Sequence, residues 1–418
     1  MFEPTSDLLR FATVGSVDDG KSTLIGRLLV DTRQLFDDQL EAVANASAKR
    51  GVGDLDLSFV TDGLRAEREQ GITIDVAYRY AATPTRKFVI ADCPGHVQYT
   101  RNMATGASTA DVALVVLDAT AGLKEQTRRH LCIAALLGVR YLIVAANKMD
   151  LAHWEESVYQ AVVDQVNDVA RRLGFTDSVV IPISAVNGDN VVEPGYQVGW
   201  YTGPTVLQAL ENAPAGSWAQ SGSGARLPIQ WVLRQNGGGR TYAGMINGGT
   251  FAVGDSLTLY PAEVDVTVDA INGPRGALDS VFPGLSVDVD LNKDTDAGRG
   301  DMLASAPFPT VTSEFEATLC WFADKKLQPG DRLRLKHTTR STVAMIDSIA
   351  GSLDVGTLEV SPAEALETND IGLVTIQTAE PIVVDDYRDN RVTGSFILIN
   401  EATNATVAPG MIGHANFL

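Results

Sequence analysis

The pattern of hydrophobic and polar positions along the chain changes character near residue 214. Before that point, short apolar runs alternate with stretches in which apolar residues recur at helical spacing. The apolar runs predict strands at residues 8–14, 88–91, 112–117, 141–145 and 179–183. The helical spacing predicts one helix that begins at Lys21 and two that cover 127–137 and 155–173. This alternation is typical of an α/β domain with a doubly wound, mostly parallel sheet.

The second half of the chain has the pattern of an all-β structure. Its apolar segments, such as 227–233 and 264–271, are short and separated by turns rich in Gly, Asp and Pro, as in small β-barrels. Residues 213–225 are rich in Ala, Gly, Ser and Pro and predict a linker, and the segment 307–309 marks a further break. We therefore expect an α/β domain followed by two small β-barrels. The expected domains are residues 1–215, 216–308 and 309–418.

A phosphate-binding loop lies between the first predicted strand and the first predicted helix. Residues 15–22 read Gly-Ser-Val-Asp-Asp-Gly-Lys-Ser, which matches the GxxxxGK(S/T) pattern. Backbone N–H groups of such a loop and of the following helix surround the phosphates of a nucleotide. We expect Lys21 to reach the terminal phosphates and Ser22 to bind Mg²⁺. The candidate nucleotide-binding residues here are Gly15, Ser16, Val17, Asp18, Asp19, Gly20, Lys21, Ser22 and Thr23.

Two further motifs indicate a site that senses the third phosphate of a nucleotide. Asp92-Cys93-Pro94-Gly95-His96 follows a predicted strand, so Asp92 can hold Mg²⁺ through water and the Gly95 N–H can contact the γ-phosphate. Thr73 can complete the Mg²⁺ shell when a γ-phosphate orders its loop. Taken singly, the first motif is a common turn and Thr73 fits an ordinary strand. Their order along the chain favours the nucleotide interpretation.

Residues 147–150, Asn-Lys-Met-Asp, indicate that the base is guanine. The Asp150 carboxylate can accept two hydrogen bonds from the N1–H and 2-amino groups of guanine, and adenine lacks that donor pair. Asn147 would tie neighbouring loops together and Lys148 would stack along the base. Ser184 and Ala185 follow another predicted strand, where a backbone N–H can contact the guanine carbonyl. The motifs together predict GTP or GDP bound with Mg²⁺.

Charge, composition and the N-terminal sequence limit the partners and the cellular compartment that we expect for this protein. The net charge of −19 opposes non-specific nucleic-acid binding, and no apolar run approaches the roughly 20 residues of a membrane helix. The N-terminus lacks the basic and apolar regions of a signal peptide. The cysteines, Cys93, Cys132 and Cys320, are scattered and fit free thiols in a reducing compartment. We expect a cytoplasmic protein with neither a nucleic-acid nor a membrane partner.

The motif set resembles the translation-factor class of GTPases, the group that contains elongation factor Tu. Those proteins pair a GTP-binding domain with two β-barrels. The resemblance implies that His96 orients the attacking water, with Val17 and Ile72 gating its approach and Lys21 and Thr73 in the catalytic site. It also implies that Asp18 can hold a monovalent cation near the phosphates. The alternative for His96 is a hydrogen-bonded surface residue of a mobile segment.

One departure from that class points to a narrower family. Translation factors usually carry His where this chain has Asp19, and residues 15–29 resemble the GTPase subunit of sulfate adenylyltransferase. Other segments fit that family: 31–39, 62–68, 336–340, 369–372 and 389–399. The resemblance implies a heteromeric enzyme of sulfate activation. In it, a partner catalytic small subunit makes adenylylsulfate from ATP and sulfate, and GTP hydrolysis on this subunit drives the reaction.

Several alternatives stay open at this point. A translation factor that carries aminoacyl-tRNA shares the motifs, although Asp19 and the charge of −19 oppose it. A nucleotide-gated module with negligible turnover is a third candidate.

The roles of individual segments also stay open. Residues 336–340 and 388–396 could contact the partner or the GTP-binding domain, or they could be exposed barrel loops. The polar segment 31–68, with a helical stretch at 37–48, is of the kind that is often functional or mobile. No second phosphate-loop pattern occurs before Leu418, so we expect no adenylylsulfate kinase domain within these residues.

Overall fold

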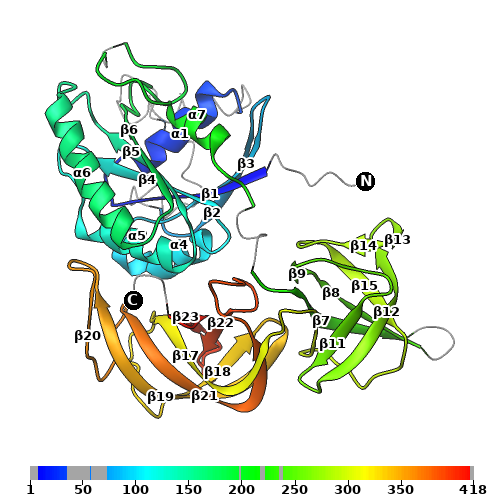
Figure 1. The fold of residues 1–418 in the computed structure, drawn as a ribbon. Coiled ribbons are helices and arrows are strands. Elements are labelled where there is room, and N and C mark those ends of the chain that lie inside the picture. Colours follow the sequence, from blue (N-terminus) through cyan, green and yellow to red (C-terminus); the bar gives the residue numbers. More distant parts are fainter. Residues whose placement is uncertain are drawn as a thin grey trace. The chain divides into compact units, whose positions relative to one another are not determined.

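The computed structural model of the chain describes residues 8–34, 57, 73–196, 199–216, 222–234 and 239–414. The helical stretch predicted at 37–48 and the gating residue Ile72 lie outside these residues. The chain divides into two compact units (Figure 1). One unit holds residues 1–216, and the other holds most of the remainder.

The first unit is built on a sheet of six strands in the order β2-β3-β1-β4-β5-β6. The strands are β1 Leu8–Gly15, β2 Ala77–Ala82, β3 Lys87–Asp92, β4 Val112–Asp118, β5 Tyr141–Asn147 and β6 Asp177–Pro182. All neighbours are parallel except β2, which runs antiparallel to β3. The predicted mostly parallel sheet is therefore confirmed. The strand β2 was not predicted, because as an edge strand it alternates half-buried and exposed residues instead of forming an apolar run.

Helices cover both faces of this sheet, as the doubly wound prediction required (Figure 1). They are α1 Lys21–Asp31, α4 Thr100–Ala107, α5 Glu125–Leu136, α6 Glu156–Arg172 and α7 Val206–Asn212, with a 3₁₀ turn η2 at Val97–Tyr99. On α1, Leu24 and Leu28 pack with Phe11 of β1 in one core cluster. On α6, Val162, Val166 and Val169 form the buried stripe.

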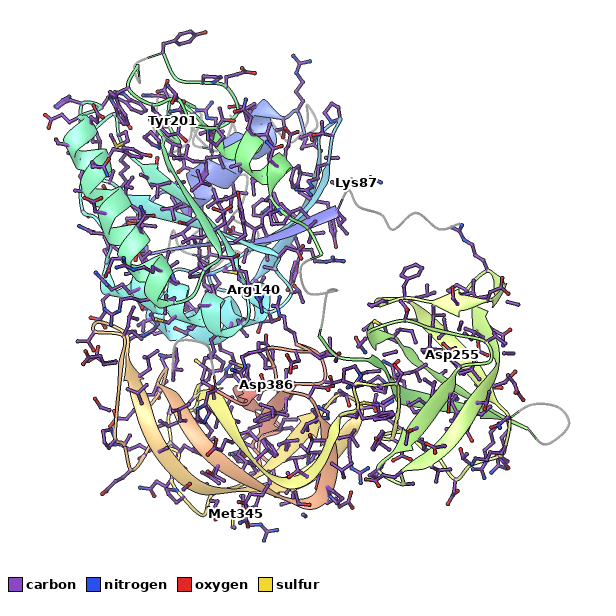
Figure 2. All side chains as sticks on the ribbon, viewed as in Figure 1. Lys87, Arg140, Tyr201, Asp255, Met345 and Asp386 are labelled. Carbon is purple, nitrogen blue, oxygen red and sulfur yellow. The ribbon has the colours of Figure 1, made fainter. Side chains whose placement is uncertain are left out.

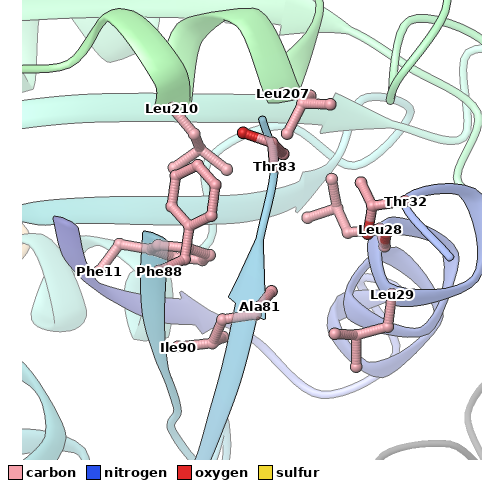
Figure 3. Close-up of a pocket in the computed structure, with 10 residues that line it drawn as sticks. All are labelled: Phe11, Leu28, Leu29, Thr32, Ala81, Thr83, Phe88, Ile90, Leu207 and Leu210. Carbon is pink, nitrogen blue, oxygen red and sulfur yellow. Dashed lines mark hydrogen bonds between the residues drawn. The ribbon is translucent and has the colours of Figure 1, made fainter. Parts of the chain in front are cut away.

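A small pocket on the α1 and α7 face shows how these helices pack on the sheet (Figure 3). It is lined by Phe11, Leu28, Leu29, Thr32, Ala81, Thr83, Phe88, Ile90, Leu207 and Leu210. The two threonines are its only polar lining residues. The pocket therefore belongs to the packing of the core and lacks the convergent polar groups of a nucleotide site.

The second unit contains two closed β-barrels of six strands each. In the first barrel the ring runs β11-β16-β7-β8-β15-β12 and closes through a β11–β12 pairing. The six strands of the ring are β7 Ala225–Arg234, β8 Arg240–Met245, β11 Ser256–Tyr260, β12 Val264–Gly273, β15 Ser286–Leu291 and β16 Met302–Ala304. Short strands outside the ring are β9 Asn247–Gly248, β10 Phe251–Ala252, β13 Gly276–Leu278 and β14 Ser280–Val281. Closure leaves the strands of the ring without free edges.

The second barrel has the ring order β18-β22-β23-β17-β21-β19, closed through a β18–β19 pairing. Its strands are β17 Thr310–Cys320, β18 Arg332–His337, β19 Arg340–Asp354, β20 Glu359–Ser361, β21 Ile371–Val384, β22 Ser395–Ile399 and β23 Thr406–Ile412. Side chains alternate between core and solvent: Ala344 and Ile346 are buried, whereas Met345 between them points outward (Figure 2). The predicted fold class is thus confirmed, while the domain boundaries at 215 and 308 stay predictions.

The predicted linker at 213–225 is shorter than expected at both ends. Ala213 is buried in the core of the first unit, and its carbonyl accepts a hydrogen bond from Arg86. Ala225 already opens β7. Small residues gave the segment its linker-like composition, but small apolar side chains also fit tightly packed sites.

The segments 336–340 and 388–396, which were candidate contact loops, are partly internal to the second unit. His337 is buried and its Nε2 lies 2.7 Å from the Thr393 carbonyl oxygen. Asn390 and Thr393 are buried as well, so the exposed-loop interpretation is wrong for these three residues. Lys336 and Arg388 are exposed.

A buried arginine joins the two barrels. Arg226 of β7 is 1% exposed, and its guanidinium donates to both carboxylate oxygens of Asp385, at 3.0 and 2.8 Å. Further N–H groups donate to the carbonyls of Ser305 and Pro307, at 2.8 and 2.6 Å. Thr393 donates its hydroxyl to Asp385 at 2.5 Å. The pair is fully hydrogen-bonded, which is the condition under which a buried ion pair is tolerated.

Within the described parts of the chain, no helix combines the length and the apolarity needed to cross a membrane.

Replacing Arg226 should destabilise the second unit, because Asp385 would keep a buried and uncompensated charge. We expect Arg226→Met to lower the free energy of opening of β7 by about 3–5 kcal/mol, measured by native-state hydrogen exchange. Arg334→Met is the matched control: its pair with Glu401 spans 3.9 Å and both side chains are 43% exposed, so a loss of about 1 kcal/mol or less is expected. Equal losses in the two variants would contradict the interpretation.

Candidate nucleotide-binding site

The carboxyl ends of the parallel strands bring the predicted motifs together at one edge of the sheet. β1 ends at Gly15, β3 at Asp92 and β5 at Asn147. The Asn147 Nδ2 donates to the Asp19 carbonyl at 2.9 Å, and its Oδ1 accepts from the Ala185 N–H at 2.9 Å. Loops separated by more than a hundred residues are therefore in direct contact, with Asn147 in the bridging position predicted for it.

Glycines shape the phosphate loop. Gly20, the N-cap of α1, has a left-handed φ of 92°, and a Cβ there would lie 2.2 Å from the Asn147 Nδ2. A Cβ on Gly15 would lie 2.4 Å from the Val116 carbonyl oxygen. The loop then enters α1, whose first-turn N–H groups, at Lys21, Ser22 and Thr23, have no intrahelical acceptors. This is the backbone arrangement that binds phosphate at a helix N-terminus.

Lys21 and Asp92, the predicted phosphate and magnesium residues, are neighbours. Lys21 is 7% exposed, its Nζ lies 3.8 Å from Asp92 Oδ1, and it also donates to the Cys93 carbonyl. The Thr13 hydroxyl donates to Asp92 at 3.3 Å. Burial raises the pKa of the Cys93 thiol to about 12, so this side chain stays neutral. The carboxylate of Asp92 and the hydroxyl of Ser22 are oxygen ligands of the kind that Mg²⁺ prefers, so the residues present fit the ion.

The phosphate loop touches the segment that carries Gly95 and His96. A Cβ on Gly95 would lie 2.5 Å from the Gly15 carbonyl oxygen, so only glycine allows this approach. His96 is half-buried, and its Nδ1 accepts from the Gln98 N–H at 3.2 Å. In a neutral imidazole this hydrogen bond leaves the proton on Nε2. Thr73 is half-buried, Val17 is half-buried and Asp18 is exposed, and their catalytic and cation-binding roles stay predictions.

The base-recognition loop is fixed by its own ion pair. Lys148 has a left-handed φ of 64°, and its Nζ lies 2.8 Å from Asp118 Oδ2. Burial raises the pKa of Asp118, but hydrogen bonds from Lys148 and Thr120 outweigh that effect and lower it. Asp150 is half-buried. Burial, and after it the charge of Asp150, raise the pKa of Asp189.

The backbone contact predicted for Ser184 and Ala185 needs a qualification. The Ser184 N–H donates to the Asp189 carbonyl at 3.3 Å, and the Ala185 N–H donates to Asn147. Both groups thus have protein acceptors, and a contact to guanine would require that one of these bonds be shared or released. The guanine contact at 184–185 stays a prediction.

Sequence patterns missed three side chains that support the two loops, Lys124 and Thr127 at the phosphate loop and Asp118 at the base-recognition loop. Lys124 donates to the Asp19 carboxylate at 2.6 Å, and the Thr127 and Ser16 hydroxyls lie 3.0 Å apart. Asp118 pairs with Lys148 as described. Each partner is remote along the chain, and none of these residues belongs to a recognisable motif, so no sequence signal pointed to them.

The sequence of the chain resembles known proteins over nearly its whole length. Residues 6–215 match the elongation factor Tu GTP binding domain, and residues 314–413 match the GTP-eEF1A C-terminal domain-like family. The bifunctional enzyme CysN/CysC of Mycobacterium tuberculosis is 49% identical over 97% of this chain and 67% of its own length. Sulfate adenylyltransferase subunit 1 of Methylorubrum extorquens is 46% identical, over 97% of this chain and 87% of its own. The protein of the same name from Aeromonas hydrophila is 45% identical, over 97% and 86%.

The fold and the loops define a GTPase of the elongation factor Tu class, in which two β-barrels follow the guanine-nucleotide-binding domain. Within that class, the chain belongs to the sulfate adenylyltransferase subunit 1 family.

A methyl group at Gly95 should separate the two phosphate-contacting segments, because it would overlap the Gly15 carbonyl. We expect Gly95→Ala to weaken binding of GTP by about tenfold, a typical cost of steric overlap in a packed site. GDP should be weakened less, since the Gly95 N–H is predicted to contact the γ-phosphate. Equilibrium binding of fluorescent GTP and GDP analogues measures both. Gly199→Ala, where a Cβ meets nothing within 4 Å, should leave both affinities unchanged, and equal effects of the two substitutions would refute the assignment.

Proposed function

We propose that this chain hydrolyses GTP as one subunit of a heteromeric sulfate adenylyltransferase in sulfate assimilation. Its hydrolysis drives synthesis of adenylylsulfate from ATP and sulfate on a partner catalytic small subunit. The observation that carries the proposal is the convergence of the phosphate loop, Asp92 and Asn147 at one sheet edge. It occurs in a chain that is 45–46% identical over nearly its full length to relatives named sulfate adenylyltransferase subunit 1.

The nucleotide is held by the loops described above. Backbone N–H groups of residues 15–23 surround the phosphates. Lys21, whose Nζ lies 3.8 Å from Asp92 Oδ1, reaches the terminal phosphates. Asp150 accepts the hydrogen bonds of guanine, which gives selectivity against adenine. Ser22, Asp92 and Thr73 are the residues that would hold Mg²⁺, which supplies charge neutralisation to the phosphates when bound.

Hydrolysis requires a positioned water and a sensor of the third phosphate. We assign the water to His96, whose Nδ1 is already engaged with the Gln98 N–H, so that the Nε2 side is the one directed to a water. The Gly95 N–H senses the γ-phosphate. Val17 and Ile72 gate the approach of the water, and Asp18 holds a monovalent cation.

Coupling follows from the energetics of the reaction. Joining sulfate to the AMP moiety of ATP is strongly uphill, because the phosphosulfate anhydride is a high-energy bond. GTP hydrolysis can drive it only if this chain has different conformations with GTP and GDP and the partner binds them unequally. The two subunits would act together in the cytoplasm, in a heterodimer or a larger heteromer.

Mixing the purified chain with a sulfate adenylyltransferase catalytic subunit should make GTP turnover and adenylylsulfate formation rise together. The measurement is the ratio of phosphate released from GTP to adenylylsulfate formed, over a range of GTP concentrations. The catalytic subunit alone is the control and should form little adenylylsulfate. An adenylylsulfate yield that does not change with GTP concentration would contradict the proposal. A separate filter-binding experiment tests the translation-factor alternative, and tight GTP-dependent retention of charged tRNA there would favour that alternative.

A further inference from the structure

An acidic side chain inside the phosphate loop is the feature that the proposed function leaves unexplained. Asp19 is 1% exposed and belongs to a loop that is proposed to hold the phosphates of a nucleotide. Burial of an unpaired carboxylate is strongly unfavourable, and a second negative charge beside phosphates repels them. A structural element must therefore compensate this carboxylate.

The start of α5 provides that compensation. Lys124, the N-cap residue of α5, lies 105 positions from Asp19 along the chain, and its Nζ donates to Asp19 Oδ1 at 2.6 Å. The other oxygen of Asp19, Oδ2, accepts the Ser16 N–H at 3.1 Å. The carboxylate thus joins the ammonium to the backbone of the phosphate loop.

A second contact from the same helix supports this arrangement. Thr127 lies three residues after Lys124, on the same side of α5, and its hydroxyl lies 3.0 Å from the Ser16 hydroxyl. Both hydroxyl groups are buried. Residues 124 and 127 therefore hold the two ends of the Ser16–Asp19 turn.

The other lysines near the loop have carboxylates of their own. Lys21 faces Asp92 at 3.8 Å, and Lys148 pairs with Asp118 at 2.8 Å. Asp118 also lies close enough to Asp19 for its negative charge to act on it. Among the described residues around Asp19, Lys124 is therefore the cation that balances it.

We propose that Lys124 is a positioning residue of the nucleotide site: it neutralises Asp19 and, through that carboxylate, holds the Ser16–Asp19 turn in the shape that surrounds the phosphates. This inference rests on the proposed guanine-nucleotide function. Lys124 itself is 38% exposed at the side chain, whereas Asp19 is 1% exposed, so loss of the lysine leaves the carboxylate buried beside the phosphates.

The test is equilibrium binding of fluorescent GTP and GDP analogues to the full chain. We expect Lys124→Met to weaken both nucleotides by about tenfold or more, the usual effect of removing one partner of a buried charge pair. Adding Asp19→Asn to that variant should restore affinity to within about threefold of the original chain, because the two residues act as one unit. Lys124→Arg keeps the cation and should bind nearly as tightly as the original chain.

Lys326→Met is the matched control. The Lys326 Nζ lies 2.6 Å from a Glu367 oxygen, the same distance as in the Lys124–Asp19 pair. Unlike in that pair, the side chains of Lys326 and Glu367 are both more than half exposed. Its substitution should leave nucleotide affinity unchanged.

The outcomes separate this inference from the function on which it rests. If the unaltered chain bound no guanine nucleotide, the proposed function would fail. If it bound them and Lys124→Met bound equally well, the inference alone would fail. A loss in Lys124→Met that Asp19→Asn does not repair would also overturn it, because Lys124 would then act by some route other than the carboxylate. Should Lys124→Met not fold, the Lys124→Arg variant decides, and weak binding there would refute the inference.

Discussion

The geometry of the nucleotide site depends on one buried amide. Asn147 is 3% exposed, donates to the phosphate loop at the Asp19 carbonyl and accepts from the N–H of Ala185. An amide side chain can do this because it carries a donor and an acceptor side by side. Gly20 is required for the contact, since any Cβ there would overlap the Asn147 Nδ2. The separation between the phosphate region and the base region is therefore set by an asparagine and a glycine that are remote in sequence.

Charge balance is the second constraint on the site. A chain with a net charge of −19 has no global field to attract a nucleotide. Binding must come from local groups. Three lysines described around this site each lie opposite a carboxylate: Lys21 with Asp92, Lys124 with Asp19 and Lys148 with Asp118. The local balance leaves the backbone N–H groups of the loop and the α1 N-terminus as the features that favour an anion.

Sequence patterns predicted the elements of the fold better than the contacts between them. The apolar runs identified β1, β3, β4, β5 and β6, because strands buried on both faces read as continuous hydrophobic segments. The edge strand β2 lacks that signal and was missed. The motifs located the phosphate loop and Asn147, because spacing alone defines them. The Lys124–Asp19 and Arg226–Asp385 pairs could not be predicted, since their partners lie 105 and 159 residues apart and periodicity does not say which charged side chains meet.

The two units of the chain differ in how they are built. The first carries the phosphate loop and the segment with Gly95, which lie in direct contact; in other GTPases such segments change their contacts when a third phosphate is added. The second consists of closed barrels joined by the buried Arg226–Asp385 pair, whose polar groups are hydrogen-bonded to one another and to neighbouring carbonyls.

The central claim is that guanine nucleotide bound at this site drives adenylylsulfate synthesis. Its most direct test is adenylylsulfate formation by the Asp150→Asn variant together with the catalytic subunit, with GTP or with xanthosine triphosphate supplied. An Asn at this position can pair with the 2-carbonyl of xanthine but not with the donor pair of guanine. We predict that xanthosine triphosphate supports synthesis by the variant and that GTP supports it poorly, the reverse of the original chain. Undiminished synthesis with GTP in the variant would contradict the account.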